Sequence, residues 1–358
     1  MSRTDPFEGR LALQQRVLPG YRVAFFDLLA SRSTEGLSLY AGKPRDREAI
    51  QTAEGLNEAQ LWPARNLHLL GGPLYLCWQR DILEWIQSWD PQVLILEANP
   101  RYPSSRRALN WMHAQGRPVI GWGLGVGKAV AGWTLYLRHF DALIAYSTQG
   151  ADAYRRAGYP AERIFTAPNA VTGPPPELRP RKLSDPPRVL FVGRLQERKR
   201  LDLLLQACRA QERELELWIV GEGPARAELE RIAAREHPDT KFMGAQHGVE
   251  LETTFRQADL FVLPGTGGLA VQQAMAYALP VIVAEADGSQ RDLVGADNGW
   301  LVPPGDLEAL TGALRRALEN PNRLLQMGTA SHQIVAERVN IEIMADVFLE
   351  ALHKVRPA

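Results

Sequence analysis

Residues 260–283 read LFVLPGTGGLAVQQAMAYALPVIV, and this stretch indicates the fold class. An apolar run ends in a turn that holds three glycines and a threonine: Gly265, Thr266, Gly267 and Gly268. A helix that begins near Leu269 follows, and a second apolar run closes the segment. Strand, glycine turn, helix and strand in this order are typical of a parallel βαβ unit. Because a helix N-terminus presents free N–H groups and partial positive charge, the turn is a candidate anion site.

A second candidate anion site is the basic turn FVGRLQERKR, residues 191–200. Arg194 and Lys199 lie between an apolar run and a helix that is expected to begin near Leu201. Arg offers a planar fork of donors and Lys offers a compact, mobile charge, so the pair suits a diphosphate. The alternatives are structural: a solvated basic turn that caps a helix here, and tight helix–strand packing at the glycine turn. Because two such turns occur in one half of the chain, we favour anion binding over these structural roles.

A third turn lies in IVGEGPARAELERIA, residues 219–233. Gly221 and Gly223 separate an apolar run from a helix with Pro224 near its first turn, where proline is common. Two interpretations stay open. The turn is purely structural, or Gly221 leaves room for the base or ribose of a nucleotide.

The composition limits the class of protein. A chain of 358 residues exceeds one typical core, so two domains are expected, and 41 basic residues balance 41 acidic ones. This balance gives no support for bulk binding of nucleic acid. Cys77 and Cys208 are the only cysteines and fall in different expected domains, so we expect no disulfide. No Cys or His spacing is typical of zinc, and no metal site is predicted.

The sequence also bears on localisation. The stretch MSRTDPFEGR is polar, so we expect no signal peptide, and no apolar run is long enough to span a membrane. We therefore expect a cytoplasmic protein that is compatible with peripheral membrane contact. Trp78, Trp85 and Trp89 recur at spacings of seven and four, which predicts one helical face. That face is interpreted as core, with a membrane-facing surface as the alternative.

Short apolar runs alternate with amphipathic helices, which predicts an α/β fold of parallel sheets covered by helices on both faces. The expected strands are Gly36–Tyr40, Asn66–Leu70, Gln92–Glu97, Pro118–Trp122, Asp141–Tyr146, Arg163–Thr166, Arg188–Val192, Leu215–Val220, Lys241–Met243, Asp259–Leu263 and Pro280–Val283. We predict two Rossmann-like, doubly wound domains that face a cleft, over residues 1–170 and 188–335. A proline-rich linker, 171–187, joins them. A last helix within 336–358 has one apolar face and is expected to pack back on the N-terminal domain.

Residues 188–312 resemble the donor half of the retaining nucleotide-sugar glycosyltransferases of glycosyltransferase family 4. The matching pieces occur in the family's order and spacing: GRLQERK, IVGEGPARAELE, FMGA, ADLFVLPG, GGLAVQQAMAYALPVI and NGWLVPPGD. Residues 141–171 also resemble the end of the family's first domain, whereas the resemblance over 1–140 is weak. It implies a two-domain fold of the GT-B type and a nucleoside diphosphate sugar as donor, with UDP and GDP as the expected nucleotides.

The resemblance also implies roles for residues of the C-terminal domain. Arg194 and Lys199 would be the catalytic pair that holds the donor diphosphate and stabilises its charge. The backbone of Gly268 and Leu269 would meet the phosphates or the sugar. The other donor-binding candidates are Gly193, Gly221, Phe242, Met243, Gly244, Gly265, Thr266, Gly267 and Gln273. No cofactor is implied, and no metal is needed if the two cations stabilise the diphosphate.

Two positions depart from the family's pattern of two glutamates eight residues apart, because they hold Gly265 and Gln273. The first glutamate usually contacts the sugar hydroxyls and faces the reacting carbon, whereas Gly265 offers only its backbone. The second usually binds the donor ribose, and Gln273 keeps hydrogen-bonding groups without the charge. Residues 118–123, PVIGWG, also lack a histidine that the family often carries. The identity of the donor sugar therefore stays open.

Candidates for the acceptor side lie in the N-terminal domain: Gly20, Arg22, Asn99, Arg101, Trp122 and Gly123. Asn99 and Arg101, together with Glu97, close an expected strand, although Asn99 could instead cap a helix. GWGLGVG, residues 121–127, is a weak match to a dinucleotide-binding fingerprint, because its third glycine comes one position early. Close backbone approach to a sugar and a structural turn are the two interpretations of this segment.

Three functions are compatible with these features. The leading hypothesis is a retaining glycosyltransferase that moves a sugar to a hydroxyl of a glycan, a lipid-linked sugar or a small metabolite. The second is a non-catalytic nucleotide-sugar-binding or scaffold homologue, which Gly265 and Gln273 motivate. The third is a nucleotide-sugar epimerase of similar architecture.

Overall fold

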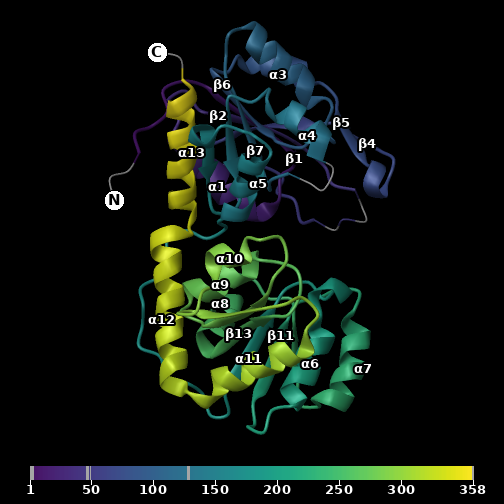
Figure 1. Ribbon diagram of the computed structural model, residues 1–358, viewed down its shortest axis with the longest axis vertical. Coiled ribbons are helices and arrows are strands. Elements are labelled where there is room, and N and C mark those ends of the chain that lie inside the picture. The colour runs from purple at the N-terminus through teal and green to yellow at the C-terminus, as the bar shows by residue number, and fades with distance from the viewer. Residues whose placement is uncertain (1–3, 46–47, 49, 127–129, 357–358) are drawn as a thin grey trace. The chain divides into compact units, whose positions relative to one another are not determined.

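The computed structural model describes residues 4–45, 48, 50–126 and 130–356, and the chain forms two compact units. Unit 1 combines the part of the chain up to Val171 with the segment from Ile341 onwards (Figure 1). Unit 2 spans Thr172–Asn340. Each unit is an α/β domain around a parallel sheet, so the predicted fold class is confirmed.

The sheet of unit 1 has the strand order β3-β2-β1-β6-β7-β8-β9 and is parallel throughout. Its strands are β1 (Leu11–Val17), β2 (Leu37–Gly42), β3 (Gln60–Ala64), β6 (Val93–Glu97), β7 (Val119–Gly123), β8 (Ala142–Ala145) and β9 (Ile164–Thr166). Side chains alternate between two cores, so Leu11 and Leu13 face one hydrophobic cluster and Ala12 faces the other. Both faces of the sheet are therefore buried.

Helices from distant parts of the chain cover the two faces of this sheet. The face of Leu11 and Leu13 packs against α1 (Val23–Ser31) and α13 (Ile341–Val355). The opposite face packs against four helices: α2 (Ile82–Trp89), α3 (Ser105–Ala114), α4 (Val130–Leu137) and α5 (Thr148–Arg156). The last helix of the chain thus completes the core of unit 1.

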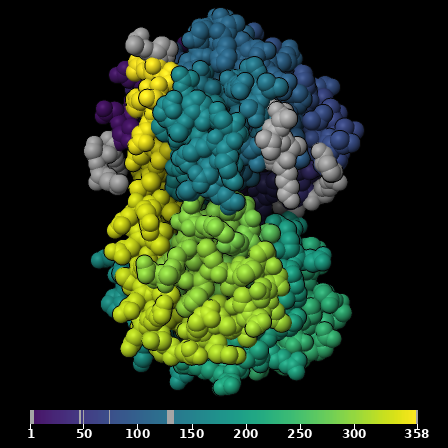
Figure 2. Space-filling view, viewed as in Figure 1, coloured from purple at the N-terminus to yellow at the C-terminus, as the bar shows by residue number. Residues whose placement is uncertain are grey.

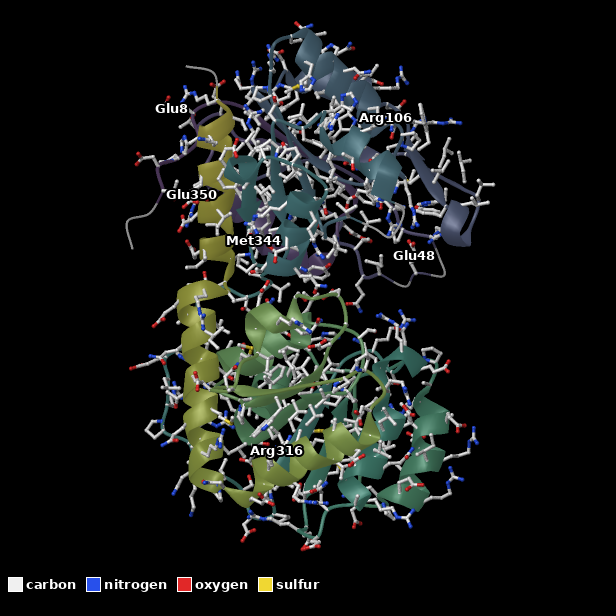
Figure 3. All side chains as sticks on the ribbon, in the orientation of Figure 1. Glu8, Glu48, Arg106, Arg316, Met344 and Glu350 are labelled. Carbon is white, nitrogen blue, oxygen red and sulfur yellow. The ribbon has the colours of Figure 1, made fainter. Side chains whose placement is uncertain are left out.

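The helix α13 follows unit 2 in the sequence but belongs to the fold of unit 1. Its Phe348 ring is fully buried and lies 5.0 Å, centroid to centroid, from both Phe25 and Trp122. Figure 3 shows Met344 turned toward unit 1 and Glu350 pointing away from it, and the outer side of the helix is visible at the surface in Figure 2. The apolar face predicted from the spacing of this helix is the face that is buried.

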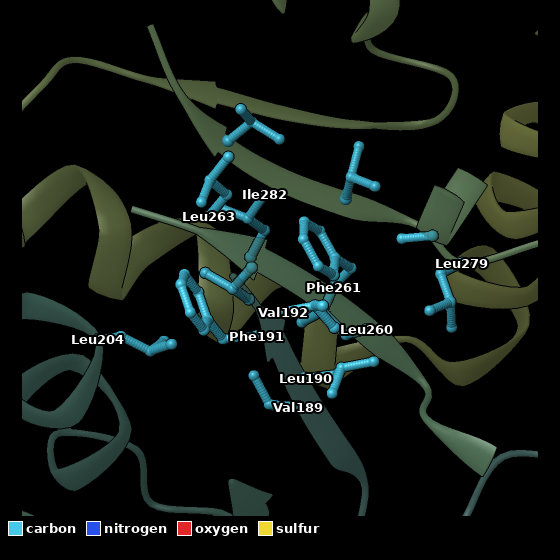
Figure 4. Packing of buried hydrophobic residues seen from close by; sticks show 14 of the residues in the cluster. Val189, Leu190, Phe191, Val192, Leu204, Leu260, Phe261, Leu263, Leu279 and Ile282 are labelled. Atoms are coloured by element: carbon cyan, nitrogen blue, oxygen red, sulfur yellow. The ribbon is translucent and has the colours of Figure 1, made fainter. Parts of the chain in front are cut away.

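The sheet of unit 2 has the order β12-β11-β10-β13-β14-β15 and is also parallel. Its strands are β10 (Arg188–Val192), β11 (Glu216–Val220), β12 (Lys241–Gly244), β13 (Leu260–Leu263), β14 (Val281–Ala284) and β15 (Gly299–Val302). Its helices are α6 (Leu201–Arg209), α7 (Arg226–Glu236), α8 (Gly248–Gln257), α9 (Leu269–Ala276), α10 (Gln290–Leu293), α11 (Leu307–Glu319) and α12 (Pro321–Arg338). Figure 4 shows the central strands of its core, where Phe191 and Phe261 are fully buried.

The order of these strands identifies the part of unit 2 where a ligand is expected. The chain runs outward from β10 through β11 to β12, then returns to the other side of β10 with β13. Such a reversal is the topological switch point of a Rossmann-like sheet, and ligands bind outside the carboxyl ends of the strands there. The loops after β10 and β13 are the basic turn and the glycine turn.

A separate two-stranded hairpin departs from the expected pattern. The strand predicted at Asn66–Leu70 is β4 (Asn66–Leu69), but it pairs antiparallel with β5 (Leu76–Gln79) across a short 3₁₀ turn, Gly72–Leu74. It is therefore not part of the parallel sheet. Four strands were not predicted from the sequence: β1, β3, β5 and β15.

The prediction that Trp78, Trp85 and Trp89 share one helical face is wrong. Trp85 and Trp89 lie in α2, but Trp78 lies in β5. Asp81, directly before α2, has a positive φ of 59°, so the chain is not helical between Trp78 and Trp85. Trp85 is fully buried, which supports the core interpretation for α2. Among the described residues no helix has the length and hydropathy that a membrane span requires.

Candidate functional site

The basic turn and the glycine turn of unit 2 meet at the switch point. The backbone N–H of Thr266 donates a 3.0 Å hydrogen bond to the carbonyl oxygen of Arg198. The side chain of Arg198 adds a second link, because its Nη1 donates to Oγ1 of Thr266 at 3.0 Å. Two loops that the sequence analysis singled out separately therefore form one continuous structure.

Lys199 points into this junction. Its Nζ donates to the carbonyl oxygen of Thr266 at 2.6 Å. Burial, together with the neighbouring Arg198 cation, lowers the pKa of Lys199 from its usual value to about 8. An ammonium group that lacks a carboxylate partner and lies beside another cation is an electrostatically prepared site for an anion. Arg194, on the same turn, is exposed.

Gly265 has no space for a side chain. A Cβ at this position would overlap the carbonyl oxygen of Arg198 and lie 2.5 Å from the carbonyl carbon of Lys199. The backbone of the basic turn occupies the space that a side chain at position 265 would need, where the family that the chain resembles usually has a glutamate. The glycine therefore allows the two turns to close on each other, which gives the departure at this position a physical cause.

The glycine turn leads into α9 without a capping side chain. Gly268 is the N-cap residue, and it supplies no side-chain hydrogen bond to the first turn of the helix. Leu269 is the first helical residue, and Gln273 is half-buried one turn further on. Free N–H groups at the start of α9 and the cations of the basic turn thus lie on the same junction.

One residue of this junction was missed by the sequence analysis. The side chain of Gln290 is fully buried, and its Nε2 donates to the carbonyl oxygen of Gly267 at 2.8 Å. Its Oε1 accepts from the backbone N–H groups of Ala286 and Gly288, each at 3.2 Å. Gln290 therefore ties the glycine turn to the loop after β14. Nothing in the residues around Gln290 signals this role, because a distant loop supplies the partner.

The candidates on the nucleoside side lie at the ends of β10, β11 and β12. A Cβ on Gly221 would overlap the carbonyl oxygen of Gly193, so the structural interpretation accounts for Gly221 on its own. The N–H of Gly221 donates to the carbonyl oxygen of Gly244 at 2.7 Å. Phe242 and Met243 precede Gly244 at the edge of the sheet and are half-buried. These residues lie beside the basic turn. Among the described residues, no backbone hydrogen bond of the turns and loops joins them to the glycine turn.

Two acceptor-side candidates in unit 1 are core residues. Trp122 is 1% exposed, and the guanidinium of Arg22 lies 4.9 Å from the centre of its ring. Arg22 is 4% exposed and donates to Oδ1 of Asn169. Phe25 and Phe348 pack against the indole of Trp122, so this candidate lies in the core of unit 1, and its acceptor-side role stays a prediction.

The remaining acceptor-side candidates lie at strand ends of unit 1. Gly20 begins a short 3₁₀ turn, Gly20–Arg22, directly after β1. Oδ1 of Asn99 accepts from the N–H of Arg101 at 3.1 Å, and α3 begins only after Ser104. Asn99 is thus a turn residue and not a helix cap.

Glu97 and Gly123 lie at the ends of neighbouring strands, β6 and β7, beside these candidates. Burial raises the pKa of Glu97 to about 7, and this carboxylate accepts a 3.1 Å hydrogen bond from the N–H of Arg16. A Cβ on Gly123 would approach the hydroxyl of Tyr154 to 2.8 Å, so packing explains this glycine. Gly127, the last glycine of the GWGLGVG segment, lies outside the described residues. Within the described part of the chain no cluster of three or more His, Cys, Asp or Glu could hold a metal.

Comparisons with solved structures support the fold, and the matches cover almost the whole chain. The outer core lipopolysaccharide galactosyltransferase WaaB has a TM-score of 0.70 at 16% identity, and the match covers 96% of this chain and 99% of that one. The Anabaena protein HepE, in complex with UDP, has a TM-score of 0.70 at 15% identity, over 96% and 99% of the two chains. The fold is thus the GT-B fold of two Rossmann-like domains.

A family model matches a segment that lies within unit 2. Residues 177–333 match the family described as glycosyl transferases group 1. The amylovoran biosynthesis glycosyltransferase AmsK of Erwinia amylovora is 30% identical over 215 residues, or 55% of this chain and 52% of that protein. A GDP-mannose-dependent alpha-mannosyltransferase of Mycobacterium tuberculosis is 40% identical over 128 residues, or 34% and 32%. The chain spans about half the length, or less, of these curated relatives.

Proposed function

We propose that the chain is a retaining glycosyltransferase that acts in the cytoplasm and moves a sugar from a nucleoside diphosphate to a hydroxyl acceptor. The observation that carries this proposal is the junction of the two turns at the switch point of unit 2. Lys199, with its lowered pKa, and the uncapped start of α9 converge there. In this proposal unit 2 binds the donor, and unit 1 binds a glycan, a lipid-linked sugar or a small metabolite.

The proposed chemistry uses charge and positioning. Lys199 and Arg194 stabilise the diphosphate as negative charge develops on it during departure. The departing diphosphate accepts the proton of the acceptor hydroxyl, which attacks from the same face of the sugar and retains the anomeric configuration. The bond from the sugar carbon to the phosphate oxygen breaks, and a bond from that carbon to the acceptor oxygen forms. The backbone of Gly268 and Leu269 orients the phosphates and the sugar.

The donor nucleotide is proposed to be UDP or GDP. The name of the mycobacterial relative includes GDP-mannose, whereas HepE was solved with UDP. Both nucleotides share the diphosphate that the junction would hold. Phe242, Met243 and Gly244, at the end of β12, are the proposed neighbours of the base.

The test is release of UDP or GDP from their sugars in the presence of acceptor candidates. Lys199→Ala and Arg194→Ala should each lower turnover about a hundredfold or more, because each removes a charge that stabilises the transition state. Arg231→Ala is the matched control, since it removes an exposed cation from α7. Unchanged turnover in both variants of the basic turn would contradict the proposal.

A non-catalytic nucleotide-sugar-binding or scaffold protein is the second candidate. The closure of the basic turn over Gly265 favours it, since no carboxylate is available at that place. This candidate predicts binding of a nucleotide sugar without release of its sugar. Turnover above background with any donor would eliminate it.

A further inference from the structure

The hairpin of β4 and β5 turns an apolar face outward. Its register pairs Leu67 with Trp78 and Leu69 with Leu76, so these four side chains share one face. Leu67 and Leu69 are exposed, whereas Trp78 and Leu76 are half-buried. A surface hairpin normally directs its polar residues toward water. Figure 1 shows this hairpin at the edge of unit 1.

The opposite face of the hairpin holds the polar residues and packs inward. Asn66 pairs with Gln79, and His68 pairs with Cys77. Nε2 of Gln79 donates to Oδ1 of Asn66 at 2.9 Å and to the carbonyl oxygen of Gln15 in β1 at 3.1 Å. Cys77 is fully buried. These contacts fix the register of the hairpin. A slip of one residue would expose the buried amides, so the same contacts hold the leucines on the outer face.

The exposed apolar area continues around the tip of the hairpin. The exposed fractions are 37% for Leu67, 47% for Leu69, 68% for Leu70 and 71% for Leu74. Of the nine large hydrophobic residues that are exposed in the described part of the chain, these four belong to one hairpin. A contiguous exposed apolar patch marks an interaction surface, whereas single exposed leucines do not.

Cations flank the base of this hairpin, where the N–H of Arg80 donates to the carbonyl oxygen of Arg65 at 3.0 Å. Residues 59–80 contain Arg65 and Arg80 and no Asp or Glu. Two cations of neighbouring segments lie over hairpin rings, Arg45 at 4.2 Å from the ring centre of Tyr75 and Arg107 at 5.9 Å from that of Trp78.

Among the described residues, two acidic side chains pair with these cations or with their neighbours. Glu48 pairs with Arg45 and Arg16, and Asp81 lies 3.8 Å from Arg65. The whole chain has no net charge, so this local excess of positive charge is a property of the hairpin region. An apolar patch with a basic rim is complementary to an anionic lipid surface.

We propose that the β4–β5 hairpin docks unit 1 on membranes that contain anionic lipids. The tip residues Leu70 and Leu74 enter the boundary between headgroups and acyl chains, together with Leu67 and Leu69. Arg65 and Arg80 remain at the level of the lipid phosphates. This inference is independent of the proposed transferase activity, because it rests on residues outside the donor junction.

The experiment is co-sedimentation of the full chain with vesicles. One set contains phosphatidylcholine alone, and the other contains equal parts of phosphatidylcholine and phosphatidylglycerol. The wild-type chain should sediment with the anionic vesicles and remain in solution with the neutral ones, and high salt should weaken the binding. Leu70→Ser combined with Leu74→Ser should weaken binding at least about tenfold, since two buried leucine side chains are lost.

The control is Val249→Ser, which removes a 79% exposed apolar side chain from α8 in unit 2 and should bind as wild type. Arg65→Gln tests the basic rim without altering the apolar face, and should weaken binding roughly fivefold. Thermal unfolding and gel filtration accompany each variant. No wild-type binding, or equal binding to both vesicle types, overturns the proposal. A wild-type dimer that the leucine variant converts to a monomer, without vesicle binding, assigns the patch to a second copy and also overturns it.

Discussion

The charge of Lys199 is the residue property on which donor binding depends most directly. Its Nζ donates to the carbonyl oxygen of Thr266, and its pKa is lowered to about 8 by burial and by Arg198. A bound diphosphate would reverse this shift, because an anion stabilises the ammonium form. Protonation of Lys199 and binding of the diphosphate are therefore coupled.

This coupling predicts a pH dependence of donor binding. Below pH 8 Lys199 carries its proton in the free protein, and affinity for a nucleoside diphosphate should be constant. As the pH rises above 8 the free protein loses this proton, so affinity should fall by up to tenfold per pH unit. Titration calorimetry between pH 7 and 10 would measure it. Lys199→Arg keeps its charge over this range and should abolish the fall, whereas an unchanged slope in that variant would assign the titration to another group.

Gly265 gives a second prediction at this scale. Gly265→Ala places a Cβ against the backbone of Arg198 and Lys199, so the two turns must separate. We expect at least tenfold weaker nucleotide binding, and the same or more for Gly265→Glu, in spite of the restored carboxylate. Gly295→Ala is the control, because a Cβ there meets no atom within 4 Å. Stronger binding or turnover in Gly265→Glu would contradict the steric account.

Single residues also differ in whether their surroundings could be predicted from the sequence. Arg194, Lys199 and the glycine turn could be named as candidates, because local spacing and residue type are typical of anion binding, and their role stays a prediction. Gln290 and the burial of Trp122 could not, since distant segments supply their partners: Gly267 for the amide and Phe348 for the indole. Sequence spacing carries no information about such contacts.

Elements with a regular apolar pattern were predictable, and those with buried polar residues were not. The face of α13 follows from steps of three and four residues. The strand β1, LALQQRV, was missed because Gln14 and Gln15 interrupt its apolar run, although both are buried. Nε2 of Gln14 donates to Oε1 of Gln79 at 2.5 Å, a pairing across 65 residues. The hairpin was missed because β5 was assigned to a helix through the spacing of Trp78 and Trp85.

The helix α13 should contribute strongly to the stability of unit 1. Phe348→Ala removes a fully buried ring that packs on Phe25 and Trp122, and should lower the free energy of unfolding by about 3–5 kcal/mol. Glu350→Ala, on the outer side of the same helix, should change it by less than about 0.5 kcal/mol. Urea unfolding followed by tryptophan fluorescence would measure both. Equal effects of the two substitutions would contradict the packing assigned to α13.

At the scale of the whole molecule, the chain crosses from unit 1 to unit 2 and then returns to unit 1. Unit 2 is formed by one continuous segment, Thr172–Asn340, with a core of its own. Unit 1 needs its C-terminal helix to bury Phe25 and Trp122. The fold class could be expected from the βαβ pattern, because parallel strands joined by helices need a sheet that is covered on both faces.

A chain that ends at Asn340 should separate the behaviour of the two units. Hydrogen exchange in β1 and β7 should become much faster, because the core under α13 is exposed, whereas β10 and β13 should keep their protection. The full-length Phe348→Ala variant should show the same pattern in weaker form. Loss of protection in both units would mean that unit 2 does not fold independently of α13.

The most direct test of the account is calorimetric binding of UDP, GDP, ADP and dTDP to the wild-type chain and to Lys199→Ala. The account predicts that one of these nucleoside diphosphates binds the wild type selectively at pH 7. It also predicts that Lys199→Ala, which should fold as the wild type does, binds that nucleotide at least about a hundredfold more weakly. Binding of none of the four, or equal binding by the variant, would contradict the assignment of the donor diphosphate to the junction of the two turns.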